Sequence, residues 1–166
     1  MKKTILKIIG IIAFTFLVFA VWYKFNYSMS EVKSFDMNSP ELTTKILIAT
    51  QGSEYKDGIL SDLTTHFKSK DVYIKVIDIY ELTEVDADRW SAICIIHTWE
   101  YGNPPFTVEE FTKKTIAKNQ LIVHTTSGEG SYRMEEVDAI TGASVMEDIP
   151  TVSTQLIERL EEVIYQ

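Results

Sequence analysis

The stretch SAICIIHT (residues 91–98) is an apolar run that ends in a histidine and a threonine. Strands buried on both faces of a parallel sheet have such continuous runs, whereas half-buried strands alternate apolar with polar residues. KILIAT (45–50) and QLIVHTT (120–126) have the same character. These three stretches therefore predict three buried parallel strands.

A fourth strand and three helices are expected between and after these runs. VYIKVIDIY (72–80) is rich in β-branched and aromatic residues but carries Lys75 and Asp78, which predicts an edge strand. Apolar residues at helical spacing predict one helix after the first strand, one after the third and one that closes the chain. The residues that mark these helices are Ile59, Leu60, Leu63 and Phe67; Val108, Phe111 and Ile116; and Val152, Leu156, Leu160, Val163 and Ile164.

Alternating strands and helices with right-handed crossovers predict an α/β fold. We expect an open, doubly wound parallel sheet of about four strands in the order 2-1-3-4. Ligands of such sheets bind outside the carboxyl ends of the strands, at the switch point between the first and third strands. Three loops should meet there: TQGSEYKDG (50–58), HTWEYGNPP (97–105) and TTSGEGSY (125–132).

The N-terminus predicts a membrane segment. Three lysines precede the uncharged run IIGIIAFTFLVFAVWY (8–23), which together with the residues before it approaches the ~20 residues that span a bilayer. We interpret residues 1–24 as a signal anchor that contacts the membrane through residues 5–23, with a cleaved signal peptide as the alternative. The positive-inside rule then keeps the N-terminus in the cytoplasm, so that the protein is single-pass in the cell membrane with an extracytoplasmic C-terminal domain. Residues 25–43 are expected to be a linker and residues 44–166 the folded domain.

Charge and cysteine content narrow the choice of function. Sixteen basic against twenty-four acidic residues give a net charge of -8, which disfavours nucleic acid as a partner. The single cysteine, Cys94, excludes an intramolecular disulfide and is expected to be a buried apolar residue. His97 and His124 end neighbouring strands, so a shared metal is conceivable, although two histidines without a third ligand are more often structural.

Three segments carry a family resemblance. The stretch IIHTWEYGNPPFTVEEF resembles the third strand of flavodoxin-like proteins with its loop and helix. The stretch LIVHTTSGEG resembles their fourth strand with its loop, and RWSAICII resembles the approach to their third strand. The resemblance covers residues 44–132. It implies a bound FMN that serves electron transfer with a redox partner protein. The chain departs from the family in one respect, because we count four strands where flavodoxins usually have five.

The resemblance also implies a set of cofactor-binding residues. The first loop would wrap the phosphate, although Glu54 and Asp57 oppose an anion there and a plain strand-to-helix turn is the alternative. Trp99 and Tyr101 would stack on the flavin ring, or else cover the top of the core. The implied residues are Thr50, Gln51, Gly52, Ser53 and Lys56 in the first loop; Thr98, Trp99, Tyr101, Gly102 and Asn103 in the second; and Thr126, Ser127 and Gly128 in the third.

The stretch DAITGAS (138–144) resembles the acceptor motif of FMN-binding domains of electron-transferring membrane complexes. In that family a flavin transferase joins FMN through a phosphoester to the last hydroxyl, which here belongs to Ser144. The resemblance implies a covalent FMN and a flavin transferase as a partner. The alternative is an ordinary loop in which Asp138 and Thr141 cap turns and Ser144 is only solvated.

Together these features predict a membrane-anchored flavodoxin-like protein that binds FMN and acts in electron transfer. The first alternative is a flavodoxin-like fold without a cofactor that serves as a membrane-tethered interaction or sensing module. A hydrolase comes third, because no nucleophile elbow is present.

Overall fold

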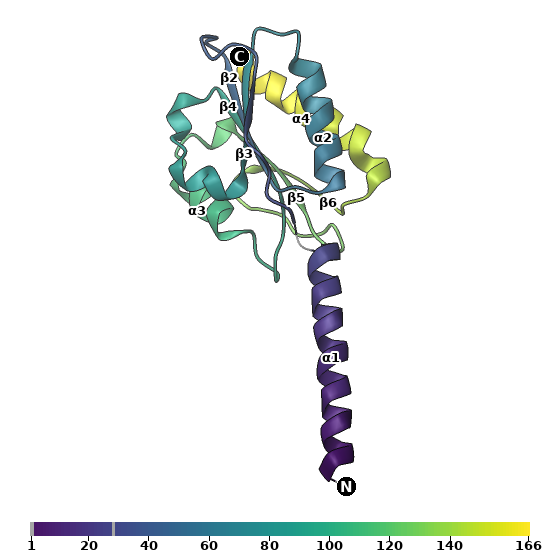
Figure 1. Ribbon diagram of the computed structural model, residues 1–166. Coiled ribbons are helices and arrows are strands. Elements are labelled where there is room, and N and C mark those ends of the chain that lie inside the picture. The colour runs from purple at the N-terminus through teal and green to yellow at the C-terminus, as the bar shows by residue number, and fades with distance from the viewer. Residues whose placement is uncertain (1, 28) are drawn as a thin grey trace. The chain divides into compact units, whose positions relative to one another are not determined.

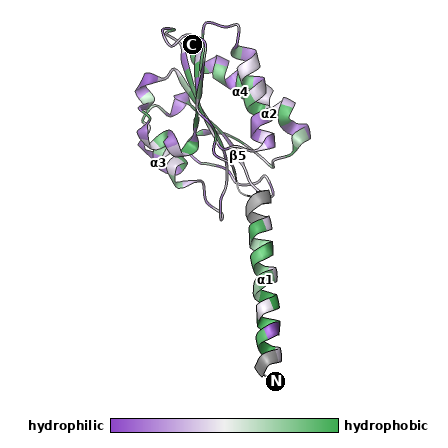
Figure 2. Cartoon of the chain, in the orientation of Figure 1, coloured by the Kyte–Doolittle hydropathy of each residue, from purple (hydrophilic) through white to green (hydrophobic). Residues whose placement is uncertain are grey.

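The computed structural model describes residues 2–27 and 29–166, and it divides into two units, Met1–Ser30 and Glu31–Gln166. The first unit consists of the helix α1 (Lys2–Tyr27), drawn in purple in Figure 1. Its segment Thr4–Trp22 is long and apolar enough to cross a membrane, and its side chains are exposed. Figure 2 shows hydrophobic residues around the helix rather than along one stripe. Such a helix is typical of a membrane span or a signal sequence.

The larger unit is built on a six-stranded sheet (Figure 1). Its spatial order is β1-β3-β2-β4-β5-β6, in which β2 to β6 run parallel and β1 pairs antiparallel with β3. Numbered among themselves, the five parallel strands follow the order 2-1-3-4-5. The strands are β1 (Phe35–Met37), β2 (Lys45–Thr50), β3 (Tyr73–Asp78), β4 (Ala92–Thr98), β5 (Leu121–Thr126) and β6 (Asp138–Gly142).

The four expected strands are adjacent in the expected order 2-1-3-4, but the expected count of four was wrong because it missed β1 at one edge and β6 at the other. The strand β6 consists of the first five residues of the motif DAITGAS, for which an ordinary loop was the alternative interpretation. It pairs in register with β5, from Ile122 opposite Asp138 to Thr126 opposite Gly142. No helix precedes it, because residues 127–137 cross directly from β5 to β6. The alternation of strand and helix, on which the prediction depended, is absent here.

The expectation that residues 72–80 form an edge strand was also wrong, because β1 covers the outer edge of β3. Residues 25–43 were expected to be a linker, yet the larger unit begins at Glu31 and includes β1. The amide of Asn38, at positive φ, donates to the carbonyls of Phe67, Lys70 and Val72 at 3.3, 3.2 and 2.7 Å. A strand of three residues shows no periodicity, so only its partner reveals it.

Helices cover both faces of the sheet (Figure 1). The helices α2 (Glu54–Phe67) and α4 (Ile149–Ile164) pack on one face, against residues such as Ile46, Ile74 and Cys94. The helix α3 (Phe106–Lys114) and the 3-10 helix η1 (Ile79–Glu84) pack on the other. Ile116, expected to mark α3, lies beyond the end of that helix and is exposed. Three short 3-10 helices complete the unit: η2 (Ala87–Arg89), η3 (Lys118–Gln120) and η4 (Met146–Asp148).

Candidate functional site

Three backbone hydrogen bonds hold the predicted loops together at the carboxyl edge of the sheet. Gln51 N–H donates to the carbonyl of Ile96 at 3.3 Å, and Trp99 N–H donates to that of Thr126 at 2.8 Å. Ser127 N–H donates to the carbonyl of Gly142 at 3.1 Å. The pairing of the strands therefore continues into the loops. The structure brings the first, second and third loops side by side, with the end of β6 beside them.

A buried lysine lies at the switch point between β2 and β4. Its ammonium nitrogen, Lys56 Nζ, donates to Thr98 Oγ1 at 2.7 Å, and Thr98 Oγ1 lies 2.8 Å from Thr126 Oγ1. The lysine side chain has no exposed surface. Burial lowers the Lys56 pKa to about 8, against the opposing effect of the carboxylates of Asp57 and Glu100. The site therefore contains one desolvated cation bonded to Thr98, which is bonded in turn to Thr126 of the neighbouring strand.

The first loop is closed by side-chain hydrogen bonds. Gln51 is buried; its Oε1 accepts from the N–H of Thr98 and its Nε2 donates to Glu100 Oε1, both at 2.8 Å. Ser53 caps α2 by accepting from the N–H of Lys56 at 3.3 Å. Thr50 Oγ1 donates to the carbonyl of Gln51 at 3.1 Å. The hydroxyls and amide of this loop are thus already bonded within the protein.

His124 lies below this network, on the face that α2 covers. Its Nδ1 is 3.2 Å from the carbonyl of Ile140 and its Nε2 is 3.1 Å from the hydroxyl of Tyr55. Because a carbonyl only accepts, Nδ1 carries the proton and Nε2 accepts from Tyr55. Burial lowers the His124 pKa to about 4, with Lys56 adding to the effect. This histidine is neutral and fully bonded.

His97 lies on the opposite face of the sheet from His124. In the ladder between β4 and β5, Ile96 pairs with His124 and His97 with Thr125, and successive side chains of a strand alternate between faces. The two histidines therefore do not point at a common site. Nor do the described residues contain a group of three or more histidine, cysteine or carboxylate side chains that could hold a metal.

Three side chains on the His97 face contain polar atoms without partners. Among the described residues, neither ring nitrogen of His97 has a hydrogen-bond partner, and the same holds for Thr125 Oγ1 and Trp99 Nε1. His97 and Thr125 have no exposed surface. Burial, to which the charge of Lys56 adds, lowers the His97 pKa to about 4 against the opposing effect of the Thr98 backbone. Buried polar groups are nearly always bonded, so four such atoms on three neighbouring residues are unusual.

The two aromatic residues of the second loop have different surroundings, and only Trp99 covers the core. Trp99 packs against the core beneath it and against Tyr132 of the third loop, with ring centroids 5.0 Å apart and planes tilted by 53°. Tyr101 is fully exposed, at positive φ, in a turn closed by backbone bonds between Glu100 and Asn103. Gly102 in the same turn also has positive φ. The aromatic neighbour of Trp99 is therefore Tyr132, which we had not selected from the sequence.

The third loop fits closely against the end of β6. Ser127 is buried and its Oγ accepts from the N–H of Tyr132 at 3.4 Å. A Cβ on Gly130, at φ +67°, would lie 2.7 Å from the nitrogen of Ala143, whereas a Cβ on Gly128 would meet nothing. Glycine is therefore required at 130 by close packing.

The motif DAITGAS divides between the sheet and the surface. Asp138 forms an ion pair with Arg159 of α4, and Ala139 and Ile140 are buried. Ser144 follows the end of β6 and is exposed. The hydroxyl that the motif would present to a transferase is thus on the surface.

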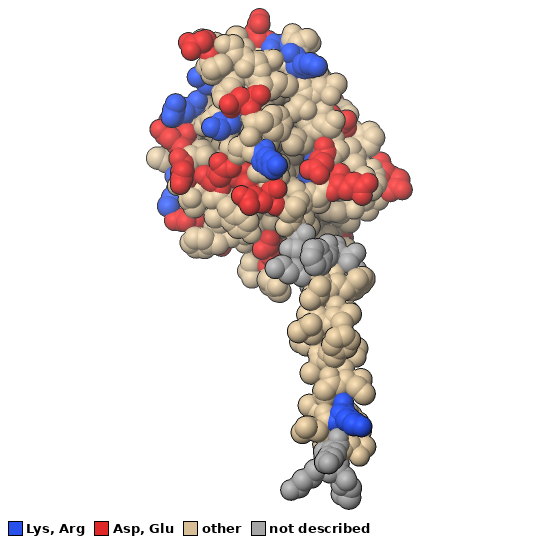
Figure 3. All heavy atoms as spheres, viewed as in Figure 1, with Lys and Arg blue, Asp and Glu red and all other residues tan. Residues whose placement is uncertain are grey.

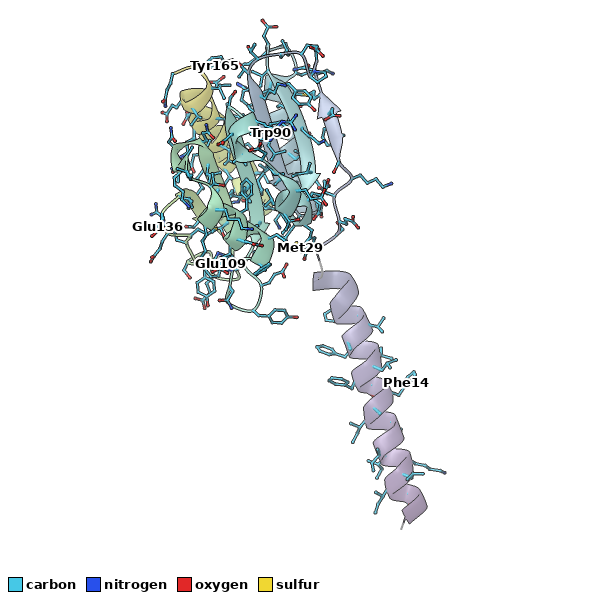
Figure 4. The ribbon with its side chains drawn as sticks, turned by 90° about the vertical axis from the view of Figure 1, so that its left-hand side faces the viewer. Phe14, Met29, Trp90, Glu109, Glu136 and Tyr165 are labelled. Carbon is cyan, nitrogen blue, oxygen red and sulfur yellow. The ribbon has the colours of Figure 1, made fainter. Side chains whose placement is uncertain are left out.

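Acidic side chains predominate around these loops. Figure 3 shows acidic side chains over much of the visible face of the domain, with basic side chains between them. Figure 4 gives the orientation: Trp90, which precedes β4, lies at one end of the sheet and Glu136, in the crossing after β5, lies toward the other. The exposed carboxylates of the edge loops include Glu54, Asp57, Glu129, Glu135 and Glu136.

A cavity of about 330 Å³ lies on the sheet away from this edge. Lys45, Tyr73 and Trp90 line it, and the rings of Tyr73 and Trp90 stack with centroids 6.1 Å apart. Its lining shares no residue with the three loops.

No protein-family model matches the sequence. No curated protein matches it either. Among solved structures, a flavodoxin from the domain Archaea is similar at a TM-score of 0.49 and 17% identity, over 72% of this chain and 99% of that one. Oxidised Flavodoxin 2 from Bacillus cereus is similar at a TM-score of 0.49 and 18% identity, with the same coverages. The metal-soaked Flv1 flavodiiron core from Synechocystis sp. PCC6803 is similar at a TM-score of 0.41 and 11% identity, over 72% of this chain and 28% of that one.

Proposed function

We propose that the larger unit binds FMN at the carboxyl edge of its sheet and carries electrons to or from a redox partner. The observation that carries this proposal is the buried ammonium of Lys56 at the switch point between β2 and β4, 2.7 Å from Thr98 Oγ1. Parallel sheets of order 2-1-3-4-5 hold their ligands at this point. A bound flavin supplies a ring that accepts and releases electrons.

The residues at the start of α2 fit a phosphate. The N–H groups of Glu54 and Tyr55, in the first turn, have no acceptor within the helix, and the helix dipole favours an anion there. Lys56 contributes the positive charge. Glu54 and Asp57 would repel the phosphate, but both are exposed, so solvent screens their charge. The site would therefore hold the phosphate with one buried cation and a helix N-terminus whose carboxylates are exposed to solvent.

Titration of the full chain in detergent with FMN and with riboflavin tests this proposal. We expect quenching of flavin fluorescence with tighter binding of FMN than of riboflavin, because only FMN carries the phosphate. Lys56→Met should remove this preference, whereas Lys113→Met, at an exposed lysine of α3, should leave it unchanged. Absence of quenching by the wild type would contradict FMN binding.

The second candidate is a cofactor-free interaction or sensing module tethered to a membrane. Two observations favour it: Gln51 bridges the first and second loops by two hydrogen bonds, and Trp99 packs directly on Tyr132. Both contacts fill the loops with the protein's own side chains. A chain that neither quenches FMN nor changes its melting temperature with FMN would favour this candidate.

Covalent attachment at Ser144 is a separate mode of binding. Three strand-to-strand steps separate the end of β2 from the end of β6, or about 14 Å at about 4.8 Å a step. One phosphate cannot reach both α2 and Ser144, so the two modes exclude each other.

Coexpression with a flavin transferase should yield a mass gain that survives denaturation and is lost in Ser144→Ala. A mass gain that persists in Ser144→Ala would rule this residue out.

A further inference from the structure

We propose that the cavity of about 330 Å³ on the sheet is a second binding site and that its ligand is a small zwitterion, an amino acid with an apolar side chain. The inference does not rest on the proposed flavin function, because the cavity shares no residue with the three loops at the carboxyl edge. The volume lies within the range of ~300–1,000 Å³ that is typical of small-molecule sites.

The cavity lies on the face of the sheet that α3 and η1 cover. Its floor belongs to β2 and β3, through residues such as Leu47 and Ile77. Helices usually connect the strands of a doubly wound sheet, but the 3-10 helices η1 and η2 connect β3 to β4. Among the described residues, none of those that line the cavity belongs to an α-helix. Figure 4 views the sheet from this side and labels Trp90, which lines the cavity.

Hydrogen bonds hold the wall of the cavity in place. At the start of η1, Asp78 Oδ1 accepts from the N–H of Tyr80 at 3.0 Å, and Glu81 Oε1 accepts from the N–H of Asp78 at 3.2 Å. At the end of η2, the N–H of Trp90 donates to the carbonyl of Ala87 at 3.1 Å. The cavity is therefore preorganised, which lowers the entropic cost of binding a ligand.

The basic side chains of the cavity have no ion-pair partner among the described residues. These side chains are Lys45, Lys75 and Arg89. The half-buried Lys75 lies in the middle of β3, opposite Asp36 of β1. Asp36 Oδ1, however, accepts from the hydroxyl of Tyr73 at 2.6 Å. Lysine is rarely buried unless it is paired, so the Lys75 ammonium is available to the carboxylate of a ligand.

Acidic side chains line the part of the wall that η1 and η2 form. Two of them are already bonded: Glu81 accepts from Ser34 Oγ, and Asp86 accepts from the N–H of Asp88 at 3.2 Å. The third, Glu84, has no hydrogen bond or ion pair among the described residues. Its carboxylate is therefore available to the ammonium group of a ligand.

Unpaired charges of both signs in one cavity favour a ligand that carries both. A simple anion would be attracted by Lys75 but repelled by Glu84, and a simple amine would experience the reverse. A zwitterion satisfies both groups at once. The apolar floor of Leu47 and Ile77, with the ring of Trp90 beside it, suits an apolar side chain between the two charges.

Titration of the full chain in detergent with L-leucine and, separately, with L-phenylalanine tests the inference. In protein labelled with 5-fluorotryptophan, the fluorine signal of Trp90 should move when the amino acid is added, because this side chain lines the cavity. The signal of Trp99, in the second loop, should stay in place. The variant Trp90→Phe identifies the Trp90 signal by its loss.

Analogues that lack one charge test the zwitterion. For leucine these are 4-methylpentanoate and 3-methylbutylamine, and for phenylalanine they are 3-phenylpropanoate and 2-phenylethylamine. Each should bind about tenfold more weakly than its amino acid, the effect of losing one charge-assisted hydrogen bond. Lys75→Gln and Glu84→Gln should weaken binding of the amino acid by a similar factor. The matched controls Lys113→Gln and Glu158→Gln, at exposed positions of α3 and α4, should bind as the wild type does.

The outcomes are distinct. If neither amino acid moves the Trp90 signal, the inference is wrong. If the carboxylate analogue binds as tightly as its amino acid, the cavity is an anion site and the assignment of a zwitterion is wrong. Unchanged affinity in both Lys75→Gln and Glu84→Gln would place the amino acid elsewhere and also overturn the inference. The FMN titrations are separate, so none of these results bears on the flavin function.

Discussion

Two adjacent threonines at the end of β5 have opposite surroundings although both are fully buried. Thr126 Oγ1 is 2.8 Å from Thr98 Oγ1, whereas Thr125 Oγ1 has no partner among the described residues. A buried hydroxyl without a partner costs free energy, and one with a partner contributes it.

Thr125→Val should therefore raise the free energy of unfolding of the larger unit by about 1 kcal/mol, because an isosteric methyl replaces an unbonded hydroxyl. Thr126→Val should lower it by a similar amount. Urea denaturation followed by circular dichroism measures both changes. If Thr125→Val is the less stable of the two, the Thr125 hydroxyl has a partner.

Lys56 should give the protein a distinctive pH dependence. Below pH 8 both the folded and the unfolded chain hold the proton, and the full cost of burying the cation is present. Between the folded pKa of about 8 and the ordinary value of 10.5 only the unfolded chain is protonated, so this group raises stability as pH rises. The total gain is about 3 kcal/mol.

The measurement is the difference in unfolding free energy between wild type and Lys56→Met from pH 7 to pH 10. The difference should increase in favour of the wild type above pH 8. Using a difference removes the opposing contribution of Cys94, whose pKa burial raises to about 12 and which destabilises the fold as pH rises above 9. A flat difference would show that Lys56 is solvated.

At the scale of elements, the buried parallel strands were predictable and the marginal ones were not. β2, β4 and β5 are continuous apolar runs, and the structure places them at the centre of the sheet. β1 and β6 are short and lie at the two edges. Their pairing comes from a neighbour already in place, so their own residues carry little signal.

Gly130 determines how the third loop meets β6. Gly130→Ala should lower the free energy of unfolding by about 2 kcal/mol, because its Cβ would clash with the backbone of Gly142 and Ala143 and its φ is positive. Gly128→Ala is the control and should change stability little, since its Cβ would meet nothing. Thermal unfolding of the two variants compares them. Equal melting temperatures would mean that the loop does not pack on β6 as described.

At the scale of the whole molecule, we propose that α1 anchors the protein in a membrane with the larger unit outside the cytoplasm. Gln155→Cys places a thiol at an exposed position of α4, while the native Cys94 is buried and should not react. A membrane-impermeant maleimide added to intact cells should label this variant. Labelling only after lysis would place the unit in the cytoplasm, and recovery of the protein from the soluble fraction would indicate a cleaved signal sequence.

The residues by themselves determined the apolar N-terminal helix, the central strands and the three loops at one edge of the sheet, because each is specified by local hydrophobic pattern. Only the tertiary structure decided that DAITG is a strand, that residues 35–37 close the sheet, and that His97 and His124 face opposite sides. It also paired Trp99 with Tyr132 rather than with Tyr101. These features depend on strand register and on contacts between distant residues, which no local pattern records.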